Sequence, residues 1–225
     1  MIVTIDGPCG SGKSTVARAL ARRMGFDYLD TGAMYRAVTW KALEEGVELD
    51  KDAESIKRVA RGVRIDFKPG DDGLRVLCDG SDVTCAIRSP EVTRNIRYVA
   101  DDPQVRDAMV RLQREYAQRH GGIVTEGRDQ GSVVFPYADV RFYLDADVET
   151  RAARRAGDFR MQGFESDFER VMEDIRQRDM ADRERPVGGL RCTDSMIVID
   201  STGMDVDDVV SRMEGLVHAE RSGKR

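Results

Sequence analysis

The residues between Gly7 and Thr15 have the types and spacing needed to hold phosphate groups. The segment Gly7-Pro-Cys-Gly-Ser-Gly12-Lys13-Ser14 matches the pattern GxxxxGK[ST] at every position. Its glycines allow successive backbone N–H groups to turn toward one anion, and the N-terminus of a following helix would strengthen the attraction. Lys13 would reach the β- and γ-phosphates of ATP, and the Ser14 hydroxyl would ligate Mg²⁺. The residues expected to bind ATP in this phosphate-binding loop (P-loop) are Gly7, Pro8, Cys9, Gly10, Ser11, Gly12, Lys13, Ser14 and Thr15.

Two charged segments follow predicted strands, at the edge where open α/β sheets bind ligands. The first places Thr31 at the start of a helix, as its cap, and Arg36 one turn into that helix. The second carries Arg128 and Asp129 directly after a buried strand, where they could bind an anion and a polar group. Both segments are also compatible with structural roles: a helix cap with a solvated arginine, and an internal ion pair. Neither segment decides the function alone.

Two arginine-rich helices are predicted on either side of a polar turn. The first carries Arg151, Arg154 and Arg155 on one face, and the second places Arg178, Asp182 and Arg185 on one face. A solvated helix with many salt bridges would have the same composition. Phosphoryl transfer, however, needs cations around the transferring oxygens and exclusion of water, and a mobile arginine-bearing lid supplies both. Because no catalytic base is evident, the pattern favours an acceptor that is itself a phosphate over an alcohol.

The periodicity of the apolar residues predicts an α/β protein with a parallel sheet covered by helices. Strands are expected at about 1–6, 26–30, 123–126, 140–144 and 196–200, with a polar loop between the third and fourth. Helices are expected at about 14–25, 33–45, 52–63, 103–118, 147–156, 167–183 and 205–220, with a further helix start at Ser89-Pro90. Residues 63–87 alternate in the manner of strands around the turn cluster Pro69 to Gly73, which predicts a small antiparallel insert.

The composition excludes several classes of protein. The 225 residues carry a net charge of −5, with a pI near 5.3, which argues against a generic nucleic-acid binder. No apolar run reaches the roughly 18 residues of a membrane span, and the N-terminus lacks the pattern of a signal peptide. The four cysteines form no CxxC pair, so neither a zinc site nor a disulfide framework is expected. We therefore expect a cytoplasmic protein with no nucleic-acid or membrane partner. A monomer is also expected, although composition does not bear on the oligomeric state.

Six segments, in order along the chain, resemble bacterial-type cytidylate kinase, a P-loop nucleoside monophosphate kinase family. They cover the P-loop from Asp6, Leu29 to Arg36, Ile87 to Val92, Val99 to Arg106, Glu126 to Pro136, and Arg178 to Arg185. The resemblance runs from about residue 2 to residue 220, and several of these motifs are not shared with adenylate, guanylate or shikimate kinases. It implies transfer of the γ-phosphate of ATP to CMP or dCMP in pyrimidine metabolism, with Mg²⁺.

The resemblance also implies a fold and a division of the chain. The fold would be a three-layer P-loop NTPase fold with a parallel five-stranded sheet, a small antiparallel β insert in the nucleotide-monophosphate (NMP) domain and a helical lid. The core would be about 1–35, 100–150 and 190–225, the NMP-binding region 36–99 and the lid 151–185, all in one kinase unit.

Roles for individual residues follow from the same resemblance. Arg36 and Arg128 would hold the CMP phosphate, Arg178 and Asp182 the pentose hydroxyls, and Thr31, Arg106, Asp129 and Arg185 the pyrimidine. Arg154 and Arg155 would bind ATP from the lid, and Lys13, Arg128 and Arg178 would be the catalytic cations.

Two residues depart from the pattern of the family. Arg97 stands where the family usually has a serine that contacts the base, and Gln130 replaces a usual apolar residue. Two alternatives also remain open: another small-molecule or nucleoside-monophosphate kinase, and a nucleotide-dependent switch. A guanine-reading NKxD motif would favour the switch, and the sequence contains none.

Overall fold

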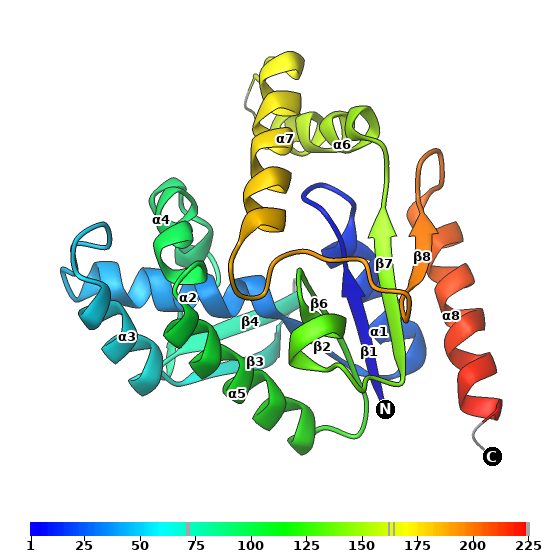
Figure 1. Cartoon of the computed structure of the whole chain (residues 1–225), viewed down its shortest axis with the longest axis horizontal. Coiled ribbons are helices and arrows are strands. Elements are labelled where there is room, and N and C mark those ends of the chain that lie inside the picture. Colours follow the sequence, from blue (N-terminus) through cyan, green and yellow to red (C-terminus); the bar gives the residue numbers. More distant parts are fainter. Residues whose placement is uncertain (71–72, 162, 164, 224–225) are drawn as a thin grey trace. The chain divides into compact units, whose positions relative to one another are not determined.

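The computed structural model describes residues 1–70, 73–161, 163 and 165–223, and the chain divides into two compact units (Figure 1). The first unit comprises Met1–Tyr28 and Ala117–Arg225, and the second comprises Leu29–Tyr116. In the described part of the chain, no helix combines the length and the apolar composition needed to cross a membrane.

The framework is a five-stranded parallel sheet with the strand order β2-β6-β1-β7-β8. Its strands are β1 (Ile2–Asp6), β2 (Asp27–Asp30), β6 (Ile123–Gly127), β7 (Val140–Asp145) and β8 (Ile197–Asp200). Every residue of β6 is buried, as expected for a parallel strand covered on both faces. The last residue of β1, Asp6, lies opposite Gly127 of β6. The register therefore places the segments that follow these two strands side by side.

Helices and turns complete the first unit: α1 (Lys13–Met24), α6 (Val148–Met161), α7 (Phe168–Glu184), α8 (Val206–Gly223) and a short π-helical turn, η2 (Gln130–Val134). Helix α1 packs on β6 and α8. Helices α6 and α7 cross each other (Figure 1) and share a small core in which Ala152 packs against Val171, Met172 and Ile175.

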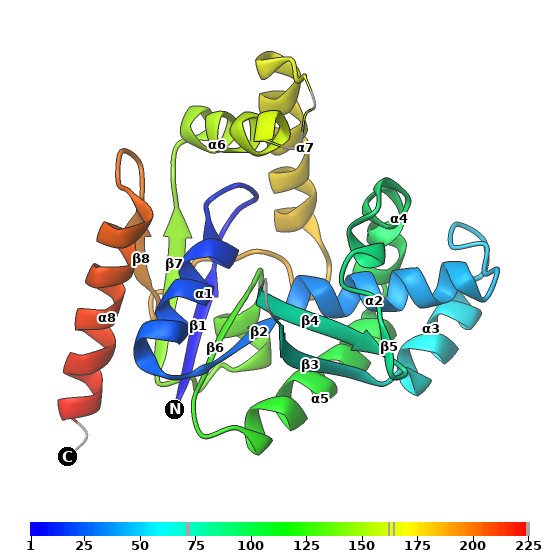
Figure 2. The same ribbon diagram turned by 180° about the vertical axis from the view of Figure 1, so that it is seen from behind.

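The second unit has its own hydrophobic core. Its elements are α2 (Thr31–Glu44), α3 (Ala53–Gly62), β3 (Ile65–Gly70), β4 (Gly73–Cys78), β5 (Ser81–Asp82), η1 (Ala86–Arg88), α4 (Pro90–Ala100) and the greater part of α5 (Pro103–Arg119). The three short strands form an antiparallel sheet in the order β3-β4-β5, and β4 contacts α2 (Figure 2). Fully buried residues of the core include Val38, Ile87 and Met109.

The predicted elements are largely confirmed, including the antiparallel insert; the two central residues of its turn cluster, Asp71 and Asp72, lie outside the described residues. The predicted helix start at Ser89 is confirmed, since its hydroxyl accepts a hydrogen bond from the N–H of Val92 and Pro90 is the first helical residue. The Asp102 carboxylate likewise accepts hydrogen bonds at the start of α5, from the N–H groups of Gln104 and Val105.

Three local predictions are wrong. Thr31 is the first residue of α2 and not its N-cap. The N-cap is Asp30, whose carboxylate accepts a hydrogen bond from the N–H of Ala33. The segment between β6 and β7 is not a plain polar loop: it contains η2, with Gln130 and Val134 buried. Helix α6 also continues to Met161, five residues beyond its predicted end at 156.

Candidate active site

The P-loop connects β1 to α1 and is closely packed against its neighbours. A Cβ atom on Gly7 would lie 2.1 Å from the carbonyl oxygen of Leu144, so only glycine fits at the point where the loop leaves β1. Gly10 has a φ of +78°, in the left-handed region that favours glycine. The predicted strand–loop–helix context of the motif is therefore confirmed.

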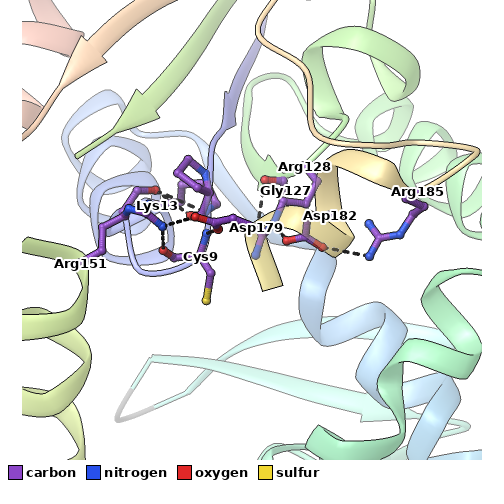
Figure 3. Close-up of polar contacts among 10 residues, drawn as sticks. Cys9, Lys13, Gly127, Arg128, Arg151, Asp179, Asp182 and Arg185 are labelled. Carbon is purple, nitrogen blue, oxygen red and sulfur yellow. Dashed lines mark hydrogen bonds and ion pairs between the residues drawn. The ribbon is translucent and has the colours of Figure 1, made fainter. Parts of the chain in front are cut away.

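Lys13 lies buried beneath this loop. Its Nζ donates hydrogen bonds to the carbonyl oxygen of Pro8, at 2.6 Å, and to Oγ of Ser11, at 3.4 Å (Figure 3). Burial, together with the nearby positive charge of Arg128, lowers the pKa of Lys13 to about 7. A negative phosphate bound in the loop would raise this pKa again. The charged form of Lys13 is therefore the form that a bound phosphate would favour.

Ser14 and Glu126 bring two oxygen ligands together at the start of α1. Oγ of Ser14 donates to Oε1 of Glu126 at 2.7 Å, and the hydroxyl of Tyr28 approaches the same oxygen at 3.4 Å. A hydroxyl beside a carboxylate suits Mg²⁺, which is usually held by one or two protein oxygens together with phosphates and water. Across the described ranges, no group of three or more His, Cys, Asp or Glu side chains forms a separate metal site.

Asp6 ties the end of β1 to the turn after β6. Its two carboxylate oxygens accept the N–H groups of Gln130, at 2.8 Å, and Gly131, at 2.7 Å. The side chain of Gln130 in turn accepts a hydrogen bond from Oγ1 of Thr125, so this departure from the family pattern is satisfied inside the protein. Asp6 thus fixes the turn that carries the neighbouring Asp129, which is itself buried.

A second cationic cluster lies in the same unit as the P-loop. Nε of Arg128 donates to Oδ2 of Asp182 at 2.5 Å, and Nη2 of Arg185 donates to Oδ1 of the same carboxylate at 2.9 Å (Figure 3). Burial alone would lower the pKa of Arg128, but the charge of Asp182 raises it above its ordinary value. Arg178 is close enough to help lower the pKa of Asp182. Four of the predicted CMP-binding residues are therefore brought together, although Arg185 lies just beyond the end of α7.

The three arginines of α6 have different environments. Nη1 of Arg151 donates to the carbonyl oxygen of Cys9 at 2.9 Å and forms an ion pair with Asp179 at 2.5 Å. Arg154 donates to the carbonyl oxygens of Ser11, at 3.4 Å, and Ser201, at 2.8 Å. The guanidinium of Arg155 instead stacks on the ring of Phe159. Two of the three therefore reach the P-loop.

The remaining predicted CMP-binding residues belong to the second unit. Thr31 is buried at the start of α2, and Nη1 of Arg36 donates to Oγ1 of Thr93 at 3.0 Å. Arg106 is buried, donates to the carbonyl oxygen of Ala100 and lies over the ring of Tyr35. In the same unit, Arg97, the residue that replaces the family serine, stacks on the ring of Tyr98 and donates to its hydroxyl at 2.8 Å.

Sequence reasoning assigned no role to three carboxylates that the structure places at this site. Asp6 is the last residue of β1 and Glu126 the last but one of β6, and a carboxylate at the carboxyl end of an apolar strand is a signal that the sequence did contain. Asp179 lies between residues that are charged or exposed on α7, and nothing in its sequence context indicates that it points inward.

Comparisons with known proteins identify the family and the fold of the chain. The family model described as cytidylate kinase matches residues 3–219. A cytidylate kinase of Anoxybacillus flavithermus is 44% identical over 98% of this chain and 97% of its own length, and one of an Exiguobacterium species is 42% identical over 96% and 95%. A shikimate kinase structure from Bacteroides thetaiotaomicron shares the fold, with a TM-score of 0.50 at 11% identity over 97% of this chain and 98% of the other. The chain therefore belongs to the cytidylate kinase family.

Proposed function

We propose that the chain transfers the γ-phosphate of ATP to CMP or dCMP, giving CDP or dCDP in pyrimidine nucleotide metabolism. The observation that carries the proposal is a P-loop with a buried Lys13, in the same unit as the Arg128–Asp182–Arg185 cluster, in a member of this family. One cationic site suits the donor phosphates, and a separate one suits an acceptor that carries its own phosphate.

The donor half consists of the P-loop and the arginines of α6. Gly7 to Thr15 bind the phosphates of ATP, with Lys13 on the transferring group, and Arg154 and Arg155 bind ATP from the lid. Ser14 and Glu126 would hold Mg²⁺ together with the phosphates, since their oxygens lie within hydrogen-bond distance of each other. When bound, the ion supplies further neutralisation of the phosphate charge.

The residues proposed to bind the acceptor recognise a nucleotide through charge and hydrogen bonds. Arg36 and Arg128 hold the CMP phosphate, Arg178 and Asp182 the pentose hydroxyls, and Thr31, Arg106, Asp129 and Arg185 the pyrimidine. A carboxylate can accept from the amino group of cytosine, and a guanidinium can donate to its carbonyl oxygen. These donors and acceptors support a cytosine nucleotide as the substrate.

The chemical step needs positioning and charge more than proton transfer. An acceptor phosphate is already ionised at neutral pH, so no side chain has to remove a proton before it attacks. Lys13, Arg128 and Arg178 are the catalytic cations: they stabilise the charge on the transferring oxygens, where fixed donors in a water-poor site act most strongly. In this assignment the core comprises about 1–35, 100–150 and 190–225, the NMP-binding region 36–99 and the lid 151–185.

The proposal includes a monomer that acts in the cytoplasm. All four cysteines are unpaired, and Cys9 lies within the P-loop itself, which suits a reducing compartment. Size-exclusion chromatography with light scattering would test the oligomeric state; a dimer would contradict this part of the proposal and leave the reaction untouched.

A coupled assay that follows ADP release tests the reaction, with ATP, Mg²⁺ and each of CMP, dCMP, UMP, AMP and shikimate in turn. We expect rapid turnover with CMP and dCMP and little with the other three. Equal turnover of AMP and CMP, or a preference for shikimate, would identify a different small-molecule kinase. Slow ATP hydrolysis that no acceptor accelerates would instead identify a nucleotide-dependent switch.

A further inference from the structure

In the first unit, the ion pair between Arg151 and Asp179 binds both the backbone N–H and the backbone C=O of Cys9 in the P-loop. Oδ1 of Asp179 accepts the N–H of Cys9 at 3.0 Å, and Nη1 of Arg151 donates to the carbonyl oxygen of Cys9 at 2.9 Å (Figure 3). The two side chains also pair with each other, at 2.5 Å between Nη1 of Arg151 and Oδ2 of Asp179. Both backbone groups of Cys9 are thus bound by residues of α6 and α7.

The pair is anchored on its far side as well. Arg151 and Asp179 are each only 6% exposed, and Nε of Arg151 donates to the carbonyl oxygen of Ala146, just after β7. A Cβ atom on Gly10 would lie 3.2 Å from both Cβ and the carbonyl oxygen of Arg151, so the loop packs directly on the first turn of α6. The guanidinium is therefore fixed by three acceptors, which Nε and Nη1 bind at the same time.

This arrangement determines the direction of the next N–H group in the loop. A trans peptide is planar, and its C=O and N–H point in opposite directions. Because Arg151 binds the carbonyl oxygen of Cys9, the N–H of Gly10 in the same peptide points away from the guanidinium. Gly10 belongs to the glycine-rich turn whose N–H groups form the anion-binding nest. The ion pair thus sets the orientation of a phosphate-binding donor without occupying the nest itself.

We propose that Arg151 and Asp179 are positioning residues for the donor site: they orient the Cys9–Gly10 peptide so that the N–H of Gly10 faces the ATP phosphates. This inference rests on the proposed function, because it takes ATP to be the ligand of the P-loop. Asp179 is the informative partner, since it is an anion beside a site for a polyanion. If its charge alone mattered, its removal would strengthen ATP binding; if it positions the loop, its removal weakens ATP binding.

The first test is Asp179→Asn, which keeps the shape and the acceptor for the N–H of Cys9 but removes the ion pair. We expect ATP affinity, measured by calorimetry without CMP, to fall about 10-fold or more, because the charged partner is lost from a buried set of hydrogen bonds. The KM for ATP should rise equally, with the KM for CMP changed less than about twofold. The matched control is Glu173→Gln, which removes the same charge from an exposed position on the same helix, 55% accessible at its side chain. It should leave both constants unchanged.

The second test is Arg151→Lys, which keeps the positive charge but cannot bind Ala146, Cys9 and Asp179 together. It should weaken ATP binding as Asp179→Asn does, and the double variant should be no worse than the weaker single variant, because both changes break the same unit. Thermal unfolding checks that the variants are folded, and Arg151→Lys tests the inference alone if Asp179→Asn does not fold.

Tighter or unchanged ATP binding in Asp179→Asn, wild-type behaviour of Arg151→Lys, or additive losses in the double variant would each overturn the inference. Failure of the proposed function gives a different result: the wild-type protein would bind ATP but would not phosphorylate CMP. The binding experiment needs no turnover, so it separates the two failures.

Discussion

Lys13 shows how a single side chain is prepared for its ligand by the backbone around it. The amine is buried, and the carbonyl oxygen of Pro8 and the hydroxyl of Ser11 accept its hydrogen bonds. These are neutral acceptors, and none of the carboxylates in the described part of the chain is bound directly to the amine. The nearby acidic groups of Glu126 and Asp182 act on the amine only through space, so its protons remain available to phosphate oxygens.

Lys13→Ala removes this cation from the transferring group. We expect kcat to fall at least about 10³-fold, because electrostatic stabilisation of the transferring oxygens dominates this kind of reaction. The measurement is turnover at saturating ATP and CMP. Lys51→Ala, at an exposed lysine paired with Glu48, is the control and should retain wild-type turnover. Near-normal turnover of Lys13→Ala would remove this lysine from the mechanism.

At the level of single residues, the sequence predicted most members of the candidate site but not the contacts between them. The spacing of the glycines and Lys13 predicted the P-loop because that motif depends only on local geometry. Arg151 and Arg155 have the same residue type on the same predicted helix, yet one binds the P-loop and the other stacks on Phe159. That difference depends on packing between segments distant in sequence, which periodicity does not report.

At the level of elements, the two turns proposed to bind ATP and CMP follow β1 and β6, and Asp6 connects them. The carboxylate of Asp6 accepts two backbone N–H groups of the turn that follows Arg128 and Asp129. The orientation of these proposed CMP-binding residues therefore depends on a residue at the end of the neighbouring strand. Asp139 makes a comparable bond at the other end of β1, where it accepts the N–H of Ile2 at 2.7 Å.

Asp6→Asn replaces one acceptor oxygen by an amide N–H₂ that would face a backbone N–H. We expect the KM for CMP to rise about 10-fold, with a smaller change in the KM for ATP, since an unpaired buried donor costs about 1–3 kcal/mol. Steady-state kinetics with each substrate varied in turn would measure this split. Asp139→Asn is the matched control: it should lower Tm in a similar way and leave the KM for CMP unchanged. Equal KM effects of the two substitutions would refute the special role of Asp6.

The antiparallel insert contains a pH-sensitive contact. Hydrogen bonds from Thr84, together with Arg75, lower the pKa of Asp82 to about 2, from an ordinary value of 3.8. A carboxyl group whose pKa is lowered in the folded state stabilises that state above its unfolded pKa. This contribution is lost as the pH falls from about 4 toward 2, because the folded protein then has to take up the proton.

Asp82→Asn should therefore lower Tm at neutral pH, and the difference from the wild type should shrink as the pH falls below about 4. Thermal unfolding followed by circular dichroism over a series of pH values would measure this difference. Asp50→Asn removes one exposed carboxylate from the same unit and controls for the change in net charge. A Tm difference that stays constant down to pH 3 would contradict the assignment.

The elements were predictable where their signals are local. Proline after Ser89 and after Asp102 marked two helix starts, because both the cap and the first-turn proline act within a few residues. The cap of α2 was predicted one residue late, since Asp30 and Thr31 are both good caps and only the hydrogen bond to Ala33 distinguishes them. The turn η2 was missed because its hydrogen-bond partner, Asp6, lies more than a hundred residues away in the sequence.

At the level of the whole molecule, the fold class was predictable because it follows from the order of elements. Strands that alternate with helices imply a parallel sheet, and the run of short alternating segments at 63–87 implied a separate antiparallel piece. The division into units was harder to see. The second unit, Leu29–Tyr116, has a core drawn from α2, α3, β4 and α5, and no change in composition marks its limits.

Two glycines of the first unit should have opposite effects on the stability of the whole protein. A Cβ atom on Gly122 would lie within 2.5–2.9 Å of the ring of Phe26, so Gly122→Ala forces that ring to move. We expect a loss of about 1–3 kcal/mol from this overpacking. Gly215 lies in the middle of α8, and apart from its chain neighbours and the adjacent backbone of its own helix, no atom of the described residues lies within 4 Å of the added carbon. There, Gly215→Ala should add about 0.5–1 kcal/mol, because alanine loses less conformational freedom in a helix.

For a protein of this size, about 1 kcal/mol corresponds to roughly 2–4 °C in Tm. Gly122→Ala should thus lower Tm by about 2–12 °C and Gly215→Ala raise it by about 1–4 °C, as measured by calorimetry. Because the two sites share no contact, the double variant should show the sum of the two changes. Turnover at 25 °C should stay at the wild-type value for Gly215→Ala, since α8 carries none of the proposed site residues. A gain in Tm with Gly122→Ala would contradict this prediction, because it would mean that the added methyl group does not clash with the Phe26 ring.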